Sequence, residues 1–90
     1  MTDKESTVLI AEDEESLRRL YSTWLDIEGY NVRTAENGAE AIELWDDDVN
    51  VVLLDRRMPE QYGDDVLETA REDGFDTPVS MITAVDPDLD

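Results

Sequence analysis

The stretch V-N-V-V-L-L-D-R-R-M-P, residues 49–59, decides how the rest of the chain is organised. Its apolar run at 51–54 is made of valine and leucine and is too short for a helix. Such a run is typical of a strand buried on both faces, in a parallel sheet that is covered by helices. Pro59 cannot donate to a sheet ladder and favours an extended Met58, so we expect a loop there. Asp55 is therefore expected at the carboxyl end of a central strand, where open α/β sheets bind ligands.

Composition limits the possible functions. Ninety residues form one small domain. The absence of cysteine and histidine excludes disulfides, thiolate chemistry, Cys/His zinc sites and a histidine base from this chain. The polar first seven residues carry no secretory or transit signal, and no apolar run approaches the roughly 20 residues of a membrane-spanning helix. We therefore expect a cytoplasmic protein without a membrane partner.

The charge is strongly acidic, with 25 acidic against seven basic residues and a net charge of −18. Nucleic-acid binding by this segment is disfavoured, because phosphate contacts need a basic face. The acidity is either an ordinary solvated surface or an adaptation to a very salty cytoplasm. At about 1 M salt the Debye length is only ~3 Å, so the acidic self-repulsion is largely screened. A single lysine among the basic residues fits the halophilic interpretation.

Short apolar runs alternate with helical patterns along the chain. Strands are expected at residues 7–11, 30–35, 51–54 and 78–83, with the second nearer an edge. Three helices are expected from apolar residues at helical spacing. The first helix carries Leu17, Leu20, Tyr21, Trp24 and Leu25, and the second carries Ala41, Ile42 and Trp45. The third, over 63–73, carries Val66, Leu67 and Ala70.

The helix ends carry recognisable signals. Asn37-Gly38 is compatible with a hairpin turn, but the helical pattern that follows makes Asn37 an expected N-cap. Gly29 and Gly74 are expected to stop the first and third helices. We expect Trp24 to pack into the core. The order β-α-β-α-β-α-β predicts a doubly wound parallel α/β sheet.

Strand ends of a parallel sheet meet at one rim, which predicts a cluster of functional residues. The first strand delivers Glu12 and Asp13, the third Asp55, and the fourth Thr83 with Ala84. Converging carboxylates raise one another's pKa values unless a cation is present, and oxygen-only ligands suit Mg²⁺. An aspartate beside such a metal can act as a nucleophile and form an acyl phosphate. The alternatives are a turn-forming role for Asp55 and simple β-propensity for Thr83.

With these residues assembled, the sequence resembles the response regulator receiver domain of two-component signalling. The matching pieces, in the family's order and spacing, are V-L-I-A-E-D-E at 8–14, A-E-N-G-A-E-A at 35–41, V-V-L-L-D-R-R-M-P at 51–59 with Gly63, and P-V-S-M-I-T-A at 78–84. The resemblance covers essentially the whole chain and implies the flavodoxin-like receiver fold. Each piece alone is a weak signal, whereas the set is specific.

The resemblance also implies roles for the rim residues. Asp55 would accept phosphate from a histidine of a partner sensor kinase. Asp13 and Asp55 would bind Mg²⁺ directly, joined by the backbone carbonyl of Arg57. Glu12 would hold the metal through water, in place of the aspartate often found there.

Further roles follow from the same resemblance. Thr83 would move towards the phosphoryl group and transmit the switch, while the small Ala84 leaves the phosphate path open. Arg56 and Arg57 would tune the phosphate lifetime, although solvated surface charges are the simpler interpretation.

The sequence departs from the family at its end. A receiver has a fifth strand with a terminal lysine and two further helices, so the last α-β-α portion is missing after Asp90. Lys4 precedes the first strand and is expected at the opposite rim. An uncovered strand at 78–83 would be a sheet edge that invites pairing. We expect residues 1–90 to be an incomplete receiver whose output domain lies beyond Asp90, with a homodimer as the alternative.

Three functions compete. The first is a phosphorylatable receiver, which is not a conventional enzyme. The second is a truncated or degenerate receiver that only mediates protein contacts or dimerisation. The third is an Mg²⁺-dependent aspartyl-phosphate phosphatase, which ranks last because Arg57 stands where such enzymes typically carry a second acid.

Overall fold

The computed structural model describes residues 6–58 and 61–82. In this part of the chain, four parallel strands form one sheet in the order β2-β1-β3-β6. Their bounds are β1 Thr7–Ala11, β2 Asn31–Ala35, β3 Val51–Asp55 and β6 Val79–Ile82. The second strand lies at an edge and the third is central, as the sequence predicted. The structure therefore confirms the doubly wound parallel sheet, although Tyr30 and Pro78, which were predicted to begin the second and fourth strands, lie just outside the observed strands.

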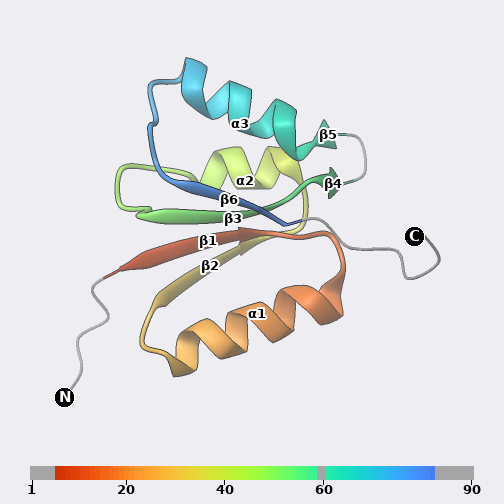
Figure 1. Ribbon diagram of the computed structural model, residues 1–90, viewed down its shortest axis with the longest axis vertical. Coiled ribbons are helices and arrows are strands. Elements are labelled where there is room, and N and C mark those ends of the chain that lie inside the picture. The colour runs from red at the N-terminus through yellow and green to blue at the C-terminus, as the bar shows by residue number, and fades with distance from the viewer. Residues whose placement is uncertain (1–5, 59–60, 83–90) are drawn as a thin grey trace.

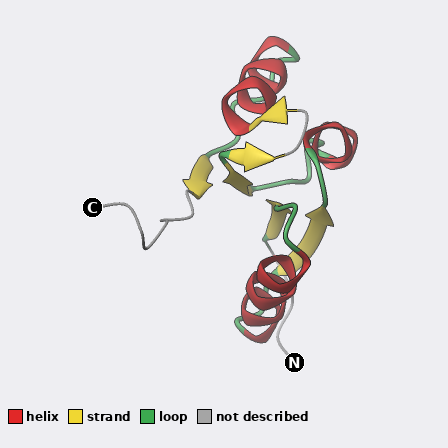
Figure 2. Ribbon diagram, turned by 90° about the vertical axis from the view of Figure 1, so that its right-hand side faces the viewer, coloured by secondary structure: helices red, strands yellow, loops and turns green. Residues whose placement is uncertain are grey.

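Helices cover both faces of this sheet. Helix α1 (Glu15–Ile27) lies on one face, and α2 (Gly38–Leu44) and α3 (Gly63–Glu72) lie on the other (Figure 1). The view along the sheet separates α1 from the other two helices (Figure 2). None of the described helices is long and apolar enough to cross a membrane.

The core lies between the sheet and the pair α2 and α3. Alternate strand residues point into it, because successive side chains of a strand face opposite sides. Its fully buried members include Leu9, Val52, Leu54, Val66 and Ala70.

The helix ends follow the predicted chemistry. The Asn37 side chain accepts a hydrogen bond from the backbone N–H of Glu40 at 2.8 Å, so Asn37 is the N-cap of α2. Gly29 and Gly74 follow α1 and α3 with φ angles of 99° and 93°, the left-handed region that glycine adopts easily. These three predictions are confirmed.

One element was not predicted. Beyond the carboxyl end of β3, the two-residue strands β4 (Arg57–Met58) and β5 (Gln61–Tyr62) pair antiparallel, where the sequence predicted a loop (Figure 1). Two residue pairs, Arg57 with Tyr62 and Met58 with Gln61, are too short to leave a periodic signal. Pro59 lies outside the described residues.

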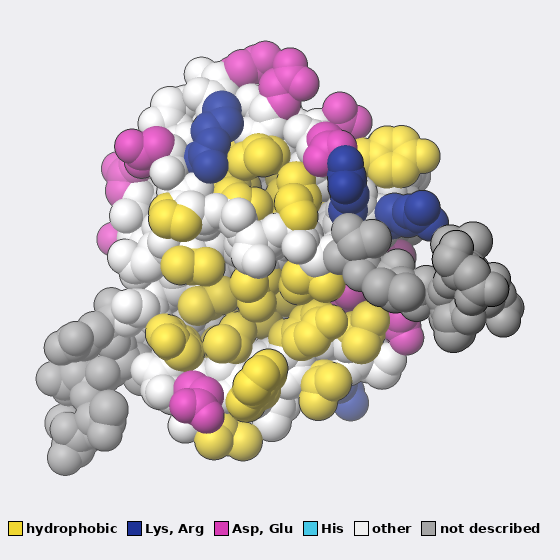
Figure 3. Space-filling view, viewed as in Figure 1, with side chains coloured by type: hydrophobic (Ala, Val, Ile, Leu, Met, Phe, Trp, Pro, Cys, Tyr) yellow, Lys and Arg dark blue, Asp and Glu magenta, His cyan; other side chains and the backbone are white. Residues whose placement is uncertain are grey.

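The prediction that Trp24 packs into the core is wrong. Trp24 is 62% exposed, and Leu20 and Ile27 of the same helix are exposed as well. The apolar stripe defines a face of α1, but α1 packs mainly against β1 and β2, so part of the stripe stays exposed. Hydrophobic side chains gather at the surface over this side of the sheet and α1 (Figure 3).

The prediction that the third strand is buried on both faces is only half right. Val52 and Leu54 are fully buried against α2 and α3, whereas Val51 and Leu53 on the α1 side are half-buried. The reason is the same placement of α1, which lies over β1 and β2 rather than over β3.

Candidate functional site

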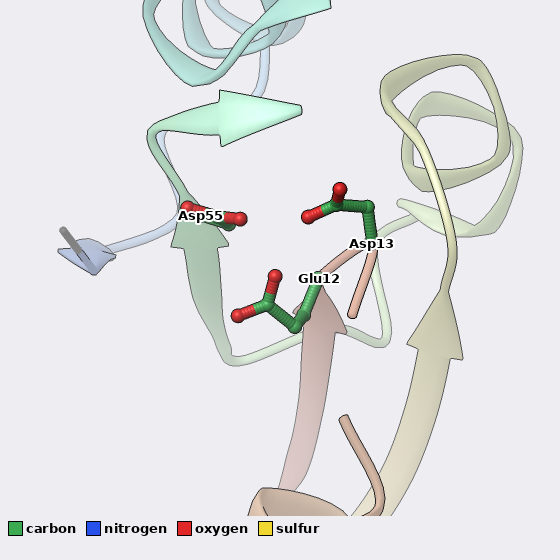
Figure 4. Close-up of side chains that lie close together, drawn as sticks. All are labelled: Glu12, Asp13 and Asp55. Carbon is green, nitrogen blue, oxygen red and sulfur yellow. The ribbon is translucent and has the colours of Figure 1, made fainter. Parts of the chain in front are cut away.

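Three carboxylates meet at the carboxyl rim of the sheet. Glu12 and Asp13 directly follow β1, and Asp55 is the last residue of β3 (Figure 4). The two strands are adjacent and parallel, with Ala11 opposite Leu54, so both strands reach the rim at the same level. The side chains of Glu12, Asp13 and Asp55 point toward one another (Figure 4).

The three carboxylates lie close together, and two of them are buried. One carboxylate oxygen from each of Glu12, Asp13 and Asp55 lies within 4.8 Å of the others. Glu12 is 3% exposed and Asp55 is 7% exposed, whereas Asp13 is exposed to solvent. Burying carboxylates this close together is costly unless a proton or a cation neutralises part of their charge.

Glu12 responds to this environment. Burial raises the pKa of Glu12 from 4.5 to about 8, and its hydrogen bonds to the Asp55 and Asp13 carboxyls and the negative charge of Asp55 act in the same direction. A hydrogen bond from the backbone N–H of Glu14, at 3.4 Å, opposes the rise. In the metal-free chain near neutral pH, Glu12 therefore keeps its proton, which reduces the charge of the cluster.

The main chain after β3 holds Asp55 in place. The backbone N–H of Arg57 donates to Oδ1 of Asp55 at 3.1 Å. The N–H of Arg56 donates to the carbonyl of Ile82 at 2.9 Å, and the N–H of Gly63 donates to the carbonyl of Arg56 at 2.9 Å. Arg56, the residue directly after the central carboxylate, is thus tied to β6 and to the start of α3.

The donor set fits a small hard dication. It contains carboxylate oxygens, which Mg²⁺ prefers. A dication would also replace the proton on Glu12 and offset the burial and the carboxylate neighbours that raise its pKa. The residues present therefore fit the predicted Mg²⁺ site.

Of the other predicted site residues, the structure describes only the two arginines after Asp55. The side chains of Arg56 and Arg57 are exposed, and Arg56 pairs with Asp64 at 3.4 Å. Thr83 and Ala84 lie outside the described residues, as does Lys4.

Two residues near the site were not singled out from the sequence. Arg18 on α1 donates to the backbone carbonyls of Glu12 and Asp13. Gly63 packs against the main chain at Asp55. The sequence pointed to Gly63 only as part of a motif. Arg18 gave no signal, because a side chain that contacts main-chain carbonyls five and six residues earlier produces no periodic pattern.

Comparison with known proteins places this geometry in a family. The family model described as "Response regulator receiver domain" matches residues 8–89. A putative transcriptional regulator of Haloferax volcanii is 54% identical over 86 residues, which are 96% of this chain and 15% of that protein. The transcriptional regulatory protein CpxR of Escherichia coli K12 is 39% identical over 83 residues, covering 92% of this chain and 35% of that protein. The chain thus spans a small part of these relatives.

Solved structures agree. The response regulator TrrA of Thermotoga maritima, crystallised in complex with Mg²⁺-BeF, superposes with a TM-score of 0.81 at 33% identity, covering 93% of this chain and 76% of that one. The chemotaxis protein CheY4 of Vibrio cholerae gives a TM-score of 0.82 at 30% identity, covering 91% and 72%. These likenesses confirm the flavodoxin-like fold, and the Haloferax relative supports the halophilic interpretation.

Proposed function

Because this chain belongs to the response regulator receiver domain family, we propose that Asp55 accepts a phosphoryl group from the histidine of a partner sensor kinase. The observation that carries this proposal is the position of Asp55, buried at the end of a central strand beside Glu12 and Asp13. A turn-forming aspartate needs no such neighbours. Receivers of this kind are generally parts of signalling proteins rather than conventional enzymes.

The acidic cluster is the proposed Mg²⁺ site. Asp13 and Asp55 would hold the cation directly, with the backbone carbonyl of Arg57, and Glu12 would hold it through water. The cation would neutralise charge on the transferring phosphoryl group when bound. In support, a solved structure similar to this chain, that of TrrA, contains Mg²⁺-BeF.

The chain's own groups then perform the transfer. An oxygen of the Asp55 carboxylate attacks phosphorus, a phosphorus–oxygen bond forms, and the phosphorus–nitrogen bond to the donor histidine breaks. The electron pair of that bond leaves with the imidazole of the kinase, and the product is an acyl phosphate. The Arg57 N–H bond to Oδ1 restricts rotation of the carboxylate, which supports a defined direction of attack.

The remaining roles complete the proposal. Thr83 is the proposed switch hydroxyl, and Ala84 the small residue beside the phosphate path. The receiver is proposed to be cytoplasmic, its partners are a sensor histidine kinase and an output domain or effector, and homodimerisation is the alternative. The acidic surface supports a receiver that does not itself bind nucleic acid.

The test is phosphorylation by a small molecule. The purified chain is incubated in molar KCl with Mg²⁺ and acetyl phosphate, and its intact mass is measured. We expect a gain of one phosphoryl group, absent in Asp55→Asn and in EDTA. Asp64→Asn, which changes an exposed carboxylate outside the cluster, is the matched control and should be phosphorylated normally.

Failure would be equally informative. A folded chain that gains no phosphoryl group contradicts phosphotransfer and leaves a protein-interaction module as the function. A gain that persists in Asp55→Asn contradicts the assignment of the acceptor. Because the single lysine is Lys4, the experiment also shows whether the chemistry proceeds without the lysine of the complete family pattern.

A further inference from the structure

Arg18 connects helix α1 to the loop that carries two of the three clustered carboxylates. Its Nη1 donates to the carbonyl oxygen of Glu12 at 3.0 Å and to that of Asp13 at 3.4 Å. Its Nη2 donates to Oε1 of Glu36, just after β2, at 3.3 Å. The Arg18 side chain is only 13% exposed. One guanidinium thus joins the loop after β1 to the loop after β2.

The two carbonyls that Arg18 binds stand on either side of one residue. The carbonyl of Glu12 belongs to the peptide unit before the α-carbon of Asp13, and the carbonyl of Asp13 belongs to the unit after it. Because peptide units are planar, holding both of them restricts the φ and ψ angles of Asp13. The main chain thereby holds the direction of the Cα–Cβ bond of Asp13, from which its carboxylate projects.

Asp13 needs this support more than its neighbours. Asp55 lies within the β3 ladder, and the N–H of Glu12 donates to the carbonyl of Ala35 at 3.0 Å, which continues the ladder of β1. Asp13 is exposed and lies between β1 and α1, and repulsion from the Asp55 carboxylate would drive its own carboxylate outward. Charge-assisted hydrogen bonds from a guanidinium oppose that movement.

We propose that Arg18 is a positioning residue, which holds the main chain on both sides of Asp13 so that the carboxylates stay converged for a divalent cation. The inference rests on the proposed function, since the cation is the one proposed for phosphotransfer. It assigns Arg18 no contact with the phosphoryl group. The ion pair with Glu36 keeps the guanidinium of Arg18 beside the loop after β1.

The experiment compares Arg18→Met, Arg18→Lys and Arg19→Met. Methionine keeps an unbranched apolar stem but has no donors, and lysine keeps the charge with a different donor geometry. Arg19 is the matched control, because it follows on the same helix, is 79% exposed and pairs with Glu15 at 3.4 Å. Mg²⁺ affinity is measured by calorimetry in molar KCl. Hydrogen exchange of residues 12–16 is measured in EDTA, without any cation.

We expect Arg18→Met to weaken Mg²⁺ binding about tenfold, the usual effect of removing a group that orients a ligand. Exchange in residues 12–16 should accelerate, while exchange in β3 and α3 stays as in the wild type. Arg18→Lys should be intermediate and Arg19→Met unchanged. A purely structural role would raise exchange throughout the chain and leave the Mg²⁺ affinity of the folded fraction unaltered.

The proposal is overturned if folded Arg18→Met keeps wild-type Mg²⁺ affinity and wild-type exchange in residues 12–16. If Arg18→Met does not fold, Arg18→Lys and Glu36→Gln decide the matter, since the Glu36 side chain is 66% exposed and its change leaves the core intact. Unaltered exchange in both variants then overturns it. If the wild type itself does not bind Mg²⁺, the proposed function loses its cation, while the exchange measurement in EDTA still tests Arg18.

Discussion

A β-carbon on Gly63 would lie 2.7 Å from the carbonyl oxygen of Asp55 and 3.0 Å from the α-carbon of Arg56. Both contacts are to main chain, which cannot turn aside as the end of a flexible side chain can. The N–H of Gly63 also donates to the carbonyl of Arg56 at 2.9 Å. The first residue of α3 therefore sets the path of the chain directly after the proposed phosphoacceptor.

Gly63→Ala is expected to destabilise the protein by about 1–3 kcal/mol, the usual cost of forcing an extra methyl group into a packed site. It should also weaken Mg²⁺ binding, because Asp55 must shift to relieve the contact. Urea unfolding and calorimetric Mg²⁺ titration measure the two effects. Gly29→Ala is the control, since it strains a φ of 99° but meets nothing within 4 Å. It should lose stability and keep its Mg²⁺ affinity, and a Gly63→Ala protein that behaves in the same way would contradict the argument.

The pKa of Glu12 predicts how stability depends on pH. The folded chain holds a proton on Glu12 up to about pH 8, whereas the unfolded chain releases it near 4.5. Between these values the folded state binds more protons, so the free energy of unfolding falls as the pH rises and levels off above the folded pKa. In EDTA we expect the melting temperature to fall between about pH 5.5 and pH 8.5, by about 4–8 °C for each kcal/mol of stability that is lost.

Two comparisons isolate Glu12 in this experiment. Glu12→Gln cannot titrate, so its melting temperature should change much less over the same range. Mg²⁺ binds the ionised carboxylates, so its stabilising effect should grow as the pH rises. A wild-type melting temperature in EDTA that is independent of pH would contradict the raised pKa.

Most of the fold could be predicted because its signals are local. The apolar run of β3, the Asn37 cap and the glycines at positions 29 and 74 each act within a few residues. The alternation of strands and helices then makes the strands parallel, and parallel strands bring Glu12, Asp13 and Asp55 to one rim. The convergence of the cluster was predictable for that reason, whereas its chemical roles are matters for experiment.

What could not be predicted depends on contacts between distant surfaces. Periodicity finds the apolar stripe of α1, but it does not say how much of that stripe the sheet covers, and Trp24 was misplaced for that reason. The β4–β5 pair is too short to leave a pattern. Arg18 contacts main-chain carbonyls with its side chain, and Gly63 packs its main chain against that of Asp55 and Arg56. Neither kind of contact produces a repeating sequence pattern.

The two tryptophans offer a matched test of this placement. Trp45 is 3% exposed, stacks on Phe75 at 6.1 Å between ring centroids, and donates from Nε1 to Oγ1 of Thr77 at 3.1 Å. Trp45→Phe removes that donor from a buried site and should cost about 1–3 kcal/mol. Trp24→Phe changes an exposed side chain and should alter the free energy of unfolding by less than about 0.5 kcal/mol.

Urea unfolding of both variants in molar KCl measures the difference, and acrylamide quenching supplies a second readout. The fluorescence of Trp24, observed in Trp45→Phe, should be quenched strongly, and that of Trp45, observed in Trp24→Phe, weakly. Equal costs and equal quenching would mean that Trp24 is covered in solution.

The net charge of −18 predicts that the protein is stabilised by salt. At about 0.01 M salt the Debye length is ~30 Å, more than twice the radius of gyration of roughly 13 Å expected for a chain of this length, so charges repel across the whole molecule. At about 1 M the length is ~3 Å and only neighbouring charges interact. In EDTA we expect the melting temperature to rise on the order of 10 °C from dilute buffer to molar KCl.

The double variant Asp47→Asn, Asp48→Asn, which removes two exposed charges beside Asp46, should show a smaller rise. A wild-type melting temperature that does not change with KCl concentration would mean that the acidic surface is an ordinary solvated one and not an adaptation to salt.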